Sequence, residues 1–133
     1  MPLPPQVGDD ELLANFVVES NKFKHDGIDH RQLMPSKTYG NTSAFRIDGL
    51  EQTEVADLGH NEVAAPRQKR GILGWAEFLA RTIRAVTPLT LSSDEPPPRH
   101  AVIEGWPQQQ EQRRALAMLL ASKATVVMHS TVP

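Results

Sequence analysis

The chain of 133 residues contains no cysteine, which excludes disulfide bonds, thiolate metal sites and a cysteine nucleophile. Aromatic residues make up only 5% of the chain, so we expect a core built mainly from aliphatic side chains. No segment approaches the roughly 18 apolar residues that a transmembrane helix needs. The opening MPLPPQVGDD also lacks the apolar centre of a signal peptide. These absences predict a cytoplasmic protein that does not enter a membrane.

Charge and length narrow the class of protein further. The net charge is -2 with a pI near 6.2, which argues against general attraction to nucleic acid or to membranes. A length of 133 residues suits one domain with a sizeable core. Eleven prolines are many for this length. We predict a flexible proline-rich lead-in over residues 1–8, a single domain over 9–128 and a loose tail over 129–133.

Two strand signals flank three consecutive prolines in the second half of the chain. Leucines alternate with polar residues over 87–92, and His100–Glu104 has the composition of a second strand. Pro96–Pro98 have fixed φ angles and no backbone donors, which favours a rigid, extended connector over a ligand for an aromatic groove. Gly105 then ends the second strand, and Pro107 suits the first position of a helix that starts at about Gln108.

Helix signals are found in three other places, and two of them are apolar residues at helical spacing. This spacing runs over 12–17, although Phe16–Val18 could equally form a short strand, and it is strong over 75–86. Asp48 and Glu51 resemble a capping box that opens a helix at about Leu50. Together these signals predict an α+β fold, with a small, mainly antiparallel sheet of about four strands covered by three or four helices. The expected strands are 44–48, 87–92, 100–104 and 124–128.

A group of imidazole and carboxylate side chains surrounds Gly27. Such side chains can bind zinc, manganese or iron, and the candidates are His25, Asp26, Asp29 and His30. Their spacing matches no known signature, because histidines five residues apart do not share a helical face. A solvated loop that leads into a short helix is the favoured interpretation, and we expect no cofactor.

Five basic residues in the middle of the chain form a second candidate site, which could bind phosphate or RNA with an affinity sensitive to salt. No aromatic residue is interleaved among the charges, so a solvated helix face is the favoured interpretation. Nucleic acid is therefore not the favoured partner. The five residues are Arg67, Lys69, Arg70, Arg81 and Arg84.

The order of several motifs resembles a family of small uncharacterised bacterial proteins. The motifs are ELLANFVVES, FKHDG, SAFRIDGL, DEPPPRHAVIEGWP and an alanine-rich last helix, and they span roughly Glu11 to Val127. The segment between Gly59 and Leu89 is least like this pattern. The resemblance implies a bacterial cytosolic origin and brings no function with it. It directs attention to Phe23, Arg46, His100, Gly105 and Trp106.

Two classes of function are compatible with these features. The first is a non-enzymatic accessory or adaptor protein that binds another protein in a larger bacterial system, because no catalytic motif is present. The second is a small enzyme acting on a phosphorylated or nucleotide substrate through histidine acid–base or metal chemistry. Its catalytic candidates are His25, His30 and His100, and its binding candidates are Arg46, Arg99 and Trp106. For His100 alone, a strand-start histidine bonded to the backbone is the simpler interpretation. The oligomeric state is not predicted.

Overall fold

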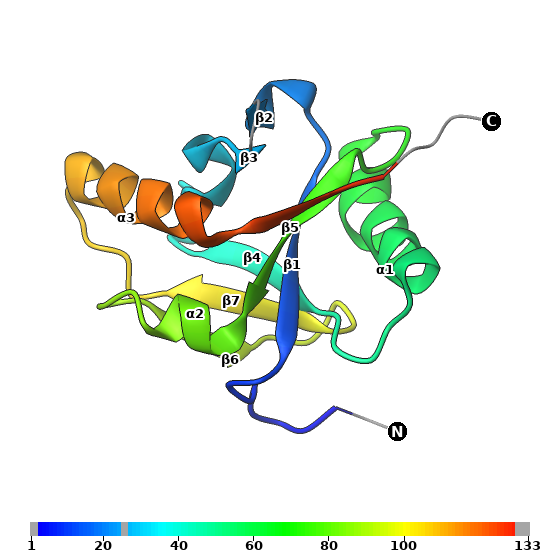
Figure 1. Ribbon diagram of the computed structural model, residues 1–133, viewed down its shortest axis with the longest axis horizontal. Helices are drawn as coiled ribbons and strands as arrows, with labels where there is room; N and C mark the ends of the chain where they lie inside the picture. The colour runs from blue at the N-terminus through cyan, green and yellow to red at the C-terminus, as the bar shows by residue number, and fades with distance from the viewer. Residues whose placement is uncertain (1–2, 25–26, 130–133) are drawn as a thin grey trace.

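A six-stranded sheet runs through the molecule in this computed structural model, which describes residues 3–24 and 27–129 (Figure 1). All neighbouring strands are antiparallel, in the order β6-β7-β4-β1-β5-β8. The predicted α+β class is confirmed, but the sheet is larger than the four strands expected. The strands are β1 (Leu12–Val17), β4 (Thr42–Arg46), β5 (Gly74–Leu79), β6 (Thr90–Ser93), β7 (His100–Glu104) and β8 (Thr125–Met128).

Helices lie on both faces of this sheet, with α3 and α1 on opposite sides in Figure 1. None of the helices in the described part of the chain has the length and apolar character needed to cross a membrane. A small hairpin of β2 (Phe23–Lys24) and β3 (Gly27–Ile28) stands apart from the main sheet. The α-helices are α1 (Gln52–Gly59), α2 (Ala80–Arg84) and α3 (Gln110–Lys123), and the short helical turns are η1 (Ser20–Lys22), η2 (His30–Leu33), η3 (His60–Ala64) and η4 (Ala65–Arg67).

The sheet separates two hydrophobic clusters. One face packs Leu13, Ala44 and Ile103 with Leu120 of α3. The other face packs side chains such as Phe45 with those of α1. Successive residues of a strand point to opposite faces, so the central strands contribute to both clusters. Burial on both faces makes the sequences of β1 and β5 largely apolar.

The helix predicted over 12–17 is wrong, because these residues form β1, a strand in the interior of the sheet. The amphipathic helix predicted over 75–86 is also wrong: residues 74–79 form β5, and only Ala80–Arg84 are helical. In both segments the alternation typical of a half-buried strand is missing because helices cover both faces of the sheet. Apolar residues then fall by chance at helical spacing.

The strands predicted near 44–48, 87–92, 100–104 and 124–128 are all present. The extended connector predicted at Pro96–Pro98 is not present. Residues 94–100 form a tight turn, in which the Asp94 N–H donates to the His100 carbonyl and the His100 N–H donates to the Pro97 carbonyl. Two helix starts also differ from the prediction. Helix α3 begins at Gln110 rather than beside Pro107, and the capping box of α1 pairs Glu51 with Glu54.

The ends of the described chain are bonded to the sheet. In the lead-in predicted to be flexible, Val7 is only 3% exposed, and the Pro4 carbonyl accepts a hydrogen bond from Arg46. At the other end, the His129 N–H donates to the Leu73 carbonyl. The rest of the predicted loose tail, 130–133, lies outside the described residues.

Candidate functional site

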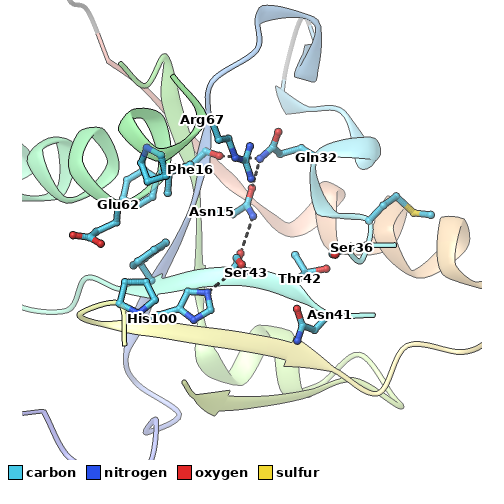
Figure 2. Close-up of a pocket in the computed structure, with 15 residues that line it drawn as sticks. Asn15, Phe16, Gln32, Ser36, Asn41, Thr42, Ser43, Glu62, Arg67 and His100 are labelled. Carbon is cyan, nitrogen blue, oxygen red and sulfur yellow. Dashed lines mark hydrogen bonds between the residues drawn. The ribbon is translucent and has the colours of Figure 1, made fainter. Parts of the chain in front are cut away.

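A cleft of about 390 Å³ lies where strands β1 and β4 diverge (Figure 2). The ladder between these strands ends at the Ala14–Phe45 pair. Beyond it, the η2 and η3–η4 segments form two walls above the strands. The lining residues are Asn15, Phe16, Gln32, Met34, Ser36, Asn41, Thr42, Ser43, Phe45, Glu62, Val63, Pro66, Arg67, Pro97 and His100.

At the floor of the cleft, side-chain amides replace the backbone hydrogen bonds that would otherwise continue the ladder between β1 and β4. The Asn15 amide donates to the Ser43 carbonyl over 2.9 Å. Gln32 in turn donates to the Asn15 side-chain oxygen at 2.8 Å and to the Phe16 carbonyl at 2.9 Å. These bonds satisfy backbone groups that would otherwise be left unpaired. They also hold β4 at a fixed separation from β1, with the Ser43 side chain exposed.

His100 contacts the side chains of Ser43 and Asp94 at this cleft. Its Nε2 lies 3.1 Å from the Ser43 hydroxyl. Its Nδ1 lies 3.0 Å from the Asp94 carbonyl oxygen and 3.2 Å from the Asp94 carboxylate. The imidazole packs edge-on against the Phe45 ring at a centroid distance of 5.2 Å. The ring is therefore held in place from three sides.

These contacts assign the tautomer of His100. Both neighbours of Nδ1 are hydrogen-bond acceptors, so Nδ1 carries the proton. In the neutral ring, Nε2 then presents its lone pair to Ser43, whose hydroxyl can donate to it. A hydroxyl bonded to a histidine base, which a third group orients, is the arrangement used to activate serine for nucleophilic attack. The arrangement can also serve general acid–base chemistry alone.

The wall opposite these residues carries one arginine and one glutamate. Arg67 is the last residue of η4 and is exposed to solvent. In the part of the chain that the structure describes, it has no ion-pair partner. Figure 2 shows the carboxylate of Glu62 directed away from Arg67 and from Ser43. The guanidinium is therefore available to an incoming anion.

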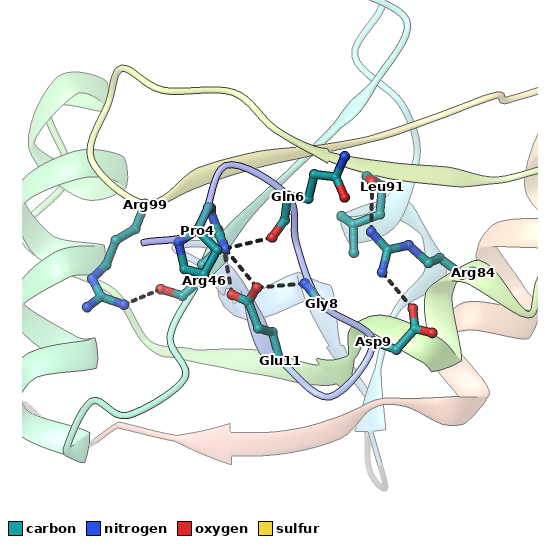
Figure 3. A network of polar contacts seen from close by, with 9 residues as sticks. All are labelled: Pro4, Gln6, Gly8, Asp9, Glu11, Arg46, Arg84, Leu91 and Arg99. Atoms are coloured by element: carbon teal, nitrogen blue, oxygen red, sulfur yellow. Dashed lines mark hydrogen bonds and ion pairs between the residues drawn. The ribbon is translucent and has the colours of Figure 1, made fainter. Parts of the chain in front are cut away.

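Arg46, one of the three predicted binding residues, is buried in the interior and paired there (Figure 3). Its side chain is 1% exposed and forms a two-pronged ion pair with Glu11 at 2.8 and 2.7 Å. It also donates to the carbonyls of Pro4 and Gln6. The Arg46 hydrogen bonds hold the pKa of the Glu11 carboxyl below its ordinary value despite partial burial. This cluster fastens the lead-in to the sheet and leaves no donor set for a ligand.

The other two predicted binding residues also make structural contacts. Arg99 has a φ of +65° in the turn before β7, and its guanidinium donates to the Arg46 carbonyl at 2.9 Å. The backbone N–H of Arg99 donates to Glu95 at 2.7 Å. Trp106 is 9% exposed, and its indole N–H donates to the Ile103 carbonyl. These contacts fix the hairpin that presents His100.

The predicted metal group is only partly described, because His25 and Asp26 lie outside the described residues. Asp29 accepts hydrogen bonds from the backbone and the guanidinium of Arg31, which lower the pKa of its carboxyl to about 2. His30 lies 3.6 Å from Asp29, and its Nδ1 is buried without a hydrogen bond among the described residues. Within those residues, no three side chains of the metal-binding types gather.

The five basic residues predicted as a patch are divided by strand β5. Arg67, Lys69 and Arg70 precede it, whereas Arg81 and Arg84 follow it on α2. Six residues of strand place these two groups roughly 20 Å apart. Arg81 and Arg84 also pair with Asp10 and Asp9. A continuous basic surface therefore does not form from these residues, and only Arg67 belongs to the cleft.

Ser43 and Asp94 are the site residues that sequence reasoning missed. Ser43 is a polar residue in the short strand β4, and Asp94 directly follows β6. The signal that could have suggested them is the strand pairing itself, because Phe45 pairs with His100 and Ser43 with Val102. This register places Ser43 and His100 diagonally across one face.

Comparisons of the chain with models of protein families, with curated proteins and with solved structures found no match. The case for a function therefore depends on the geometry of the cleft.

Proposed function

We propose that this protein is a small hydrolase that cleaves an ester through Ser43. One observation carries the proposal: a continuous hydrogen-bonded chain runs from Asp94 through His100 to Ser43 at the edge of a cleft. The cleft volume of about 390 Å³ matches that of sites for small molecules. The proposal develops the enzyme alternative, with Ser43 and Asp94 added to the predicted His100.

The reaction has two steps. The Ser43 oxygen attacks the carbonyl carbon of the ester while its proton passes to His100 Nε2. The bond to the leaving alcohol then breaks, and that alcohol takes the proton from Nε2. Water attacks the resulting acyl-serine in the same way, giving its proton to Nε2, and the carboxylic acid leaves as the proton returns to Ser43. Asp94 holds the Nδ1 proton and stabilises the imidazolium in both steps.

The test is steady-state hydrolysis of a 4-nitrophenyl ester by the purified chain. Ser43→Ala and His100→Gln should each lower kcat/KM by about 100-fold or more, the range for loss of a nucleophile or a general base. Ser92→Ala is the matched control, because Ser92 is exposed on the edge strand β6, and it should retain the wild-type rate. Thermal melts establish that each variant is folded.

Equal rates for the wild type and Ser43→Ala would overturn the proposal.

The first functional hypothesis, a protein-binding accessory role, stays a prediction. Affinity purification of the tagged chain from its native host addresses it. A stoichiometric protein partner that survives nuclease treatment would support that role. Recovery of the tagged chain alone would count against it.

A further inference from the structure

We infer that the substrate carries an anionic group that pairs with Arg67 while the ester bond lies at Ser43. This inference rests on the hydrolase function proposed above and names the class of substrate. It draws on three features of the cleft: the fixed backbone under Arg67, the balance of charge along the walls, and the separation of Arg67 from the reactive pair.

The backbone at Arg67 is tightly held. Arg67 ends the η4 turn and is followed by Gln68, whose φ of +58° reverses the chain. The Gln68 N–H donates to the Ala65 carbonyl at 3.0 Å, and the Lys69 N–H donates to the Ala64 carbonyl at 2.9 Å. Ala64 itself is 1% exposed in the core under α1. A side chain that starts from such a backbone needs little ordering of its main chain when a ligand binds.

The cation of the cleft wall is open to an anion. Among the described residues that line the cleft, Arg67 is the arginine and Glu62 the carboxylate, and Figure 2 shows the Glu62 carboxylate directed away from Arg67. Arg81 and Arg84 by contrast are paired with aspartates. Within the described residues, Arg67 lacks such a carboxylate, so a ligand anion would meet a guanidinium that has no competing partner. Guanidinium groups bind carboxylate and phosphate through paired hydrogen bonds.

Arg67 and the reactive pair lie on different walls. Arg67 comes from the η4 segment, whereas Ser43 and His100 come from β4 and β7. Figure 2 draws Asn15 between Arg67 and Ser43. A molecule that contacts both would therefore extend past Asn15 on the floor of the cleft.

The experiment compares two esters of similar length, 4-nitrophenyl monoadipate, which ends in a carboxylate, and 4-nitrophenyl hexanoate, which is uncharged. The wild type should prefer the monoadipate by about tenfold in kcat/KM, as expected for one charge-assisted contact. Arg67→Gln should abolish this preference by slowing monoadipate hydrolysis. Arg70→Gln is the matched control, because Arg70 is exposed nearby and does not line the cleft, and it should keep the preference.

The outcomes separate this inference from the proposed function. Hydrolysis that depends on Ser43 but shows no preference, or a preference that survives in Arg67→Gln, would overturn the inference alone. Absence of Ser43-dependent hydrolysis with both esters would overturn the hydrolase proposal and this inference with it. A preference that is lost in Arg67→Gln and shrinks as salt is added to the wild type would support the pairing.

Discussion

Replacing Glu11 by glutamine should destabilise the fold strongly, because it leaves the Arg46 guanidinium buried beside a neutral side chain. Arg46 is 1% exposed and Glu11 13% exposed in this pair. Loss of one partner from a buried pair costs about 3 to 5 kcal/mol. We expect about 3 kcal/mol here, since the carbonyls of Pro4 and Gln6 still accept from Arg46. For a domain of this size, that lowers Tm by about 10 °C.

The assay is urea unfolding followed by the fluorescence of the buried Trp75 and Trp106. Asp9→Asn is the matched control, because the exposed Asp9 also pairs with an arginine, and it should cost less than about 1 kcal/mol. The pKa of Glu11 is lowered in the folded state. Its contribution is therefore complete above the ordinary carboxyl pKa of about 4.3 and is lost as pH falls through the folded value.

The difference between the wild type and Glu11→Gln should accordingly be largest near neutral pH and shrink in acid. Equal losses in Glu11→Gln and Asp9→Asn, or a difference that does not change with pH, would refute this reasoning.

Two further predictions concern helix packing and a carboxyl pKa. Gly59→Ala should lower the free energy of unfolding by about 1 to 3 kcal/mol in the same assay. Alanine favours helices, but the new Cβ would meet a phenylalanine ring at 2.6 Å. A stabilised variant would contradict this packing. In an NMR titration the Asp29 carboxyl should have a pKa of about 2, and Arg31→Gln should raise this pKa toward the ordinary range; an unchanged pKa in that variant would remove Arg31 as the cause.

The sequence predicted strands β4, β6, β7 and β8 but missed the interior strands β1 and β5. Residues in β6 alternate between exposed and buried positions, so the local sequence alone indicates a strand there. Residues in β1 are buried on both faces, and α1 and α3 supply that cover from distant parts of the chain. The local spacing of apolar residues does not show that helices bury both faces of a strand. The central strand β1 was therefore mistaken for a helix.

The candidate site was predictable only as far as His100. Histidine stands out because its proton exchanges near neutral pH, whereas serine and aspartate are common in strands and turns. Arg46 was misassigned for a related reason. An arginine after two apolar residues suggests an exposed clamp, but Glu11, 35 residues earlier, closes over it. Contacts at this sequence distance depend on strand order, which the local pattern does not encode.

Covalent labelling with a fluorophosphonate is the most direct test of the central claim, which is that His100 activates Ser43. This reagent reacts with serine hydroxyls that a base deprotonates. We predict one adduct per chain, mapped by peptide mass spectrometry to Ser43, absent in Ser43→Ala and much slower in His100→Gln. No adduct on the folded wild type, or an adduct that persists in Ser43→Ala, would contradict the claim.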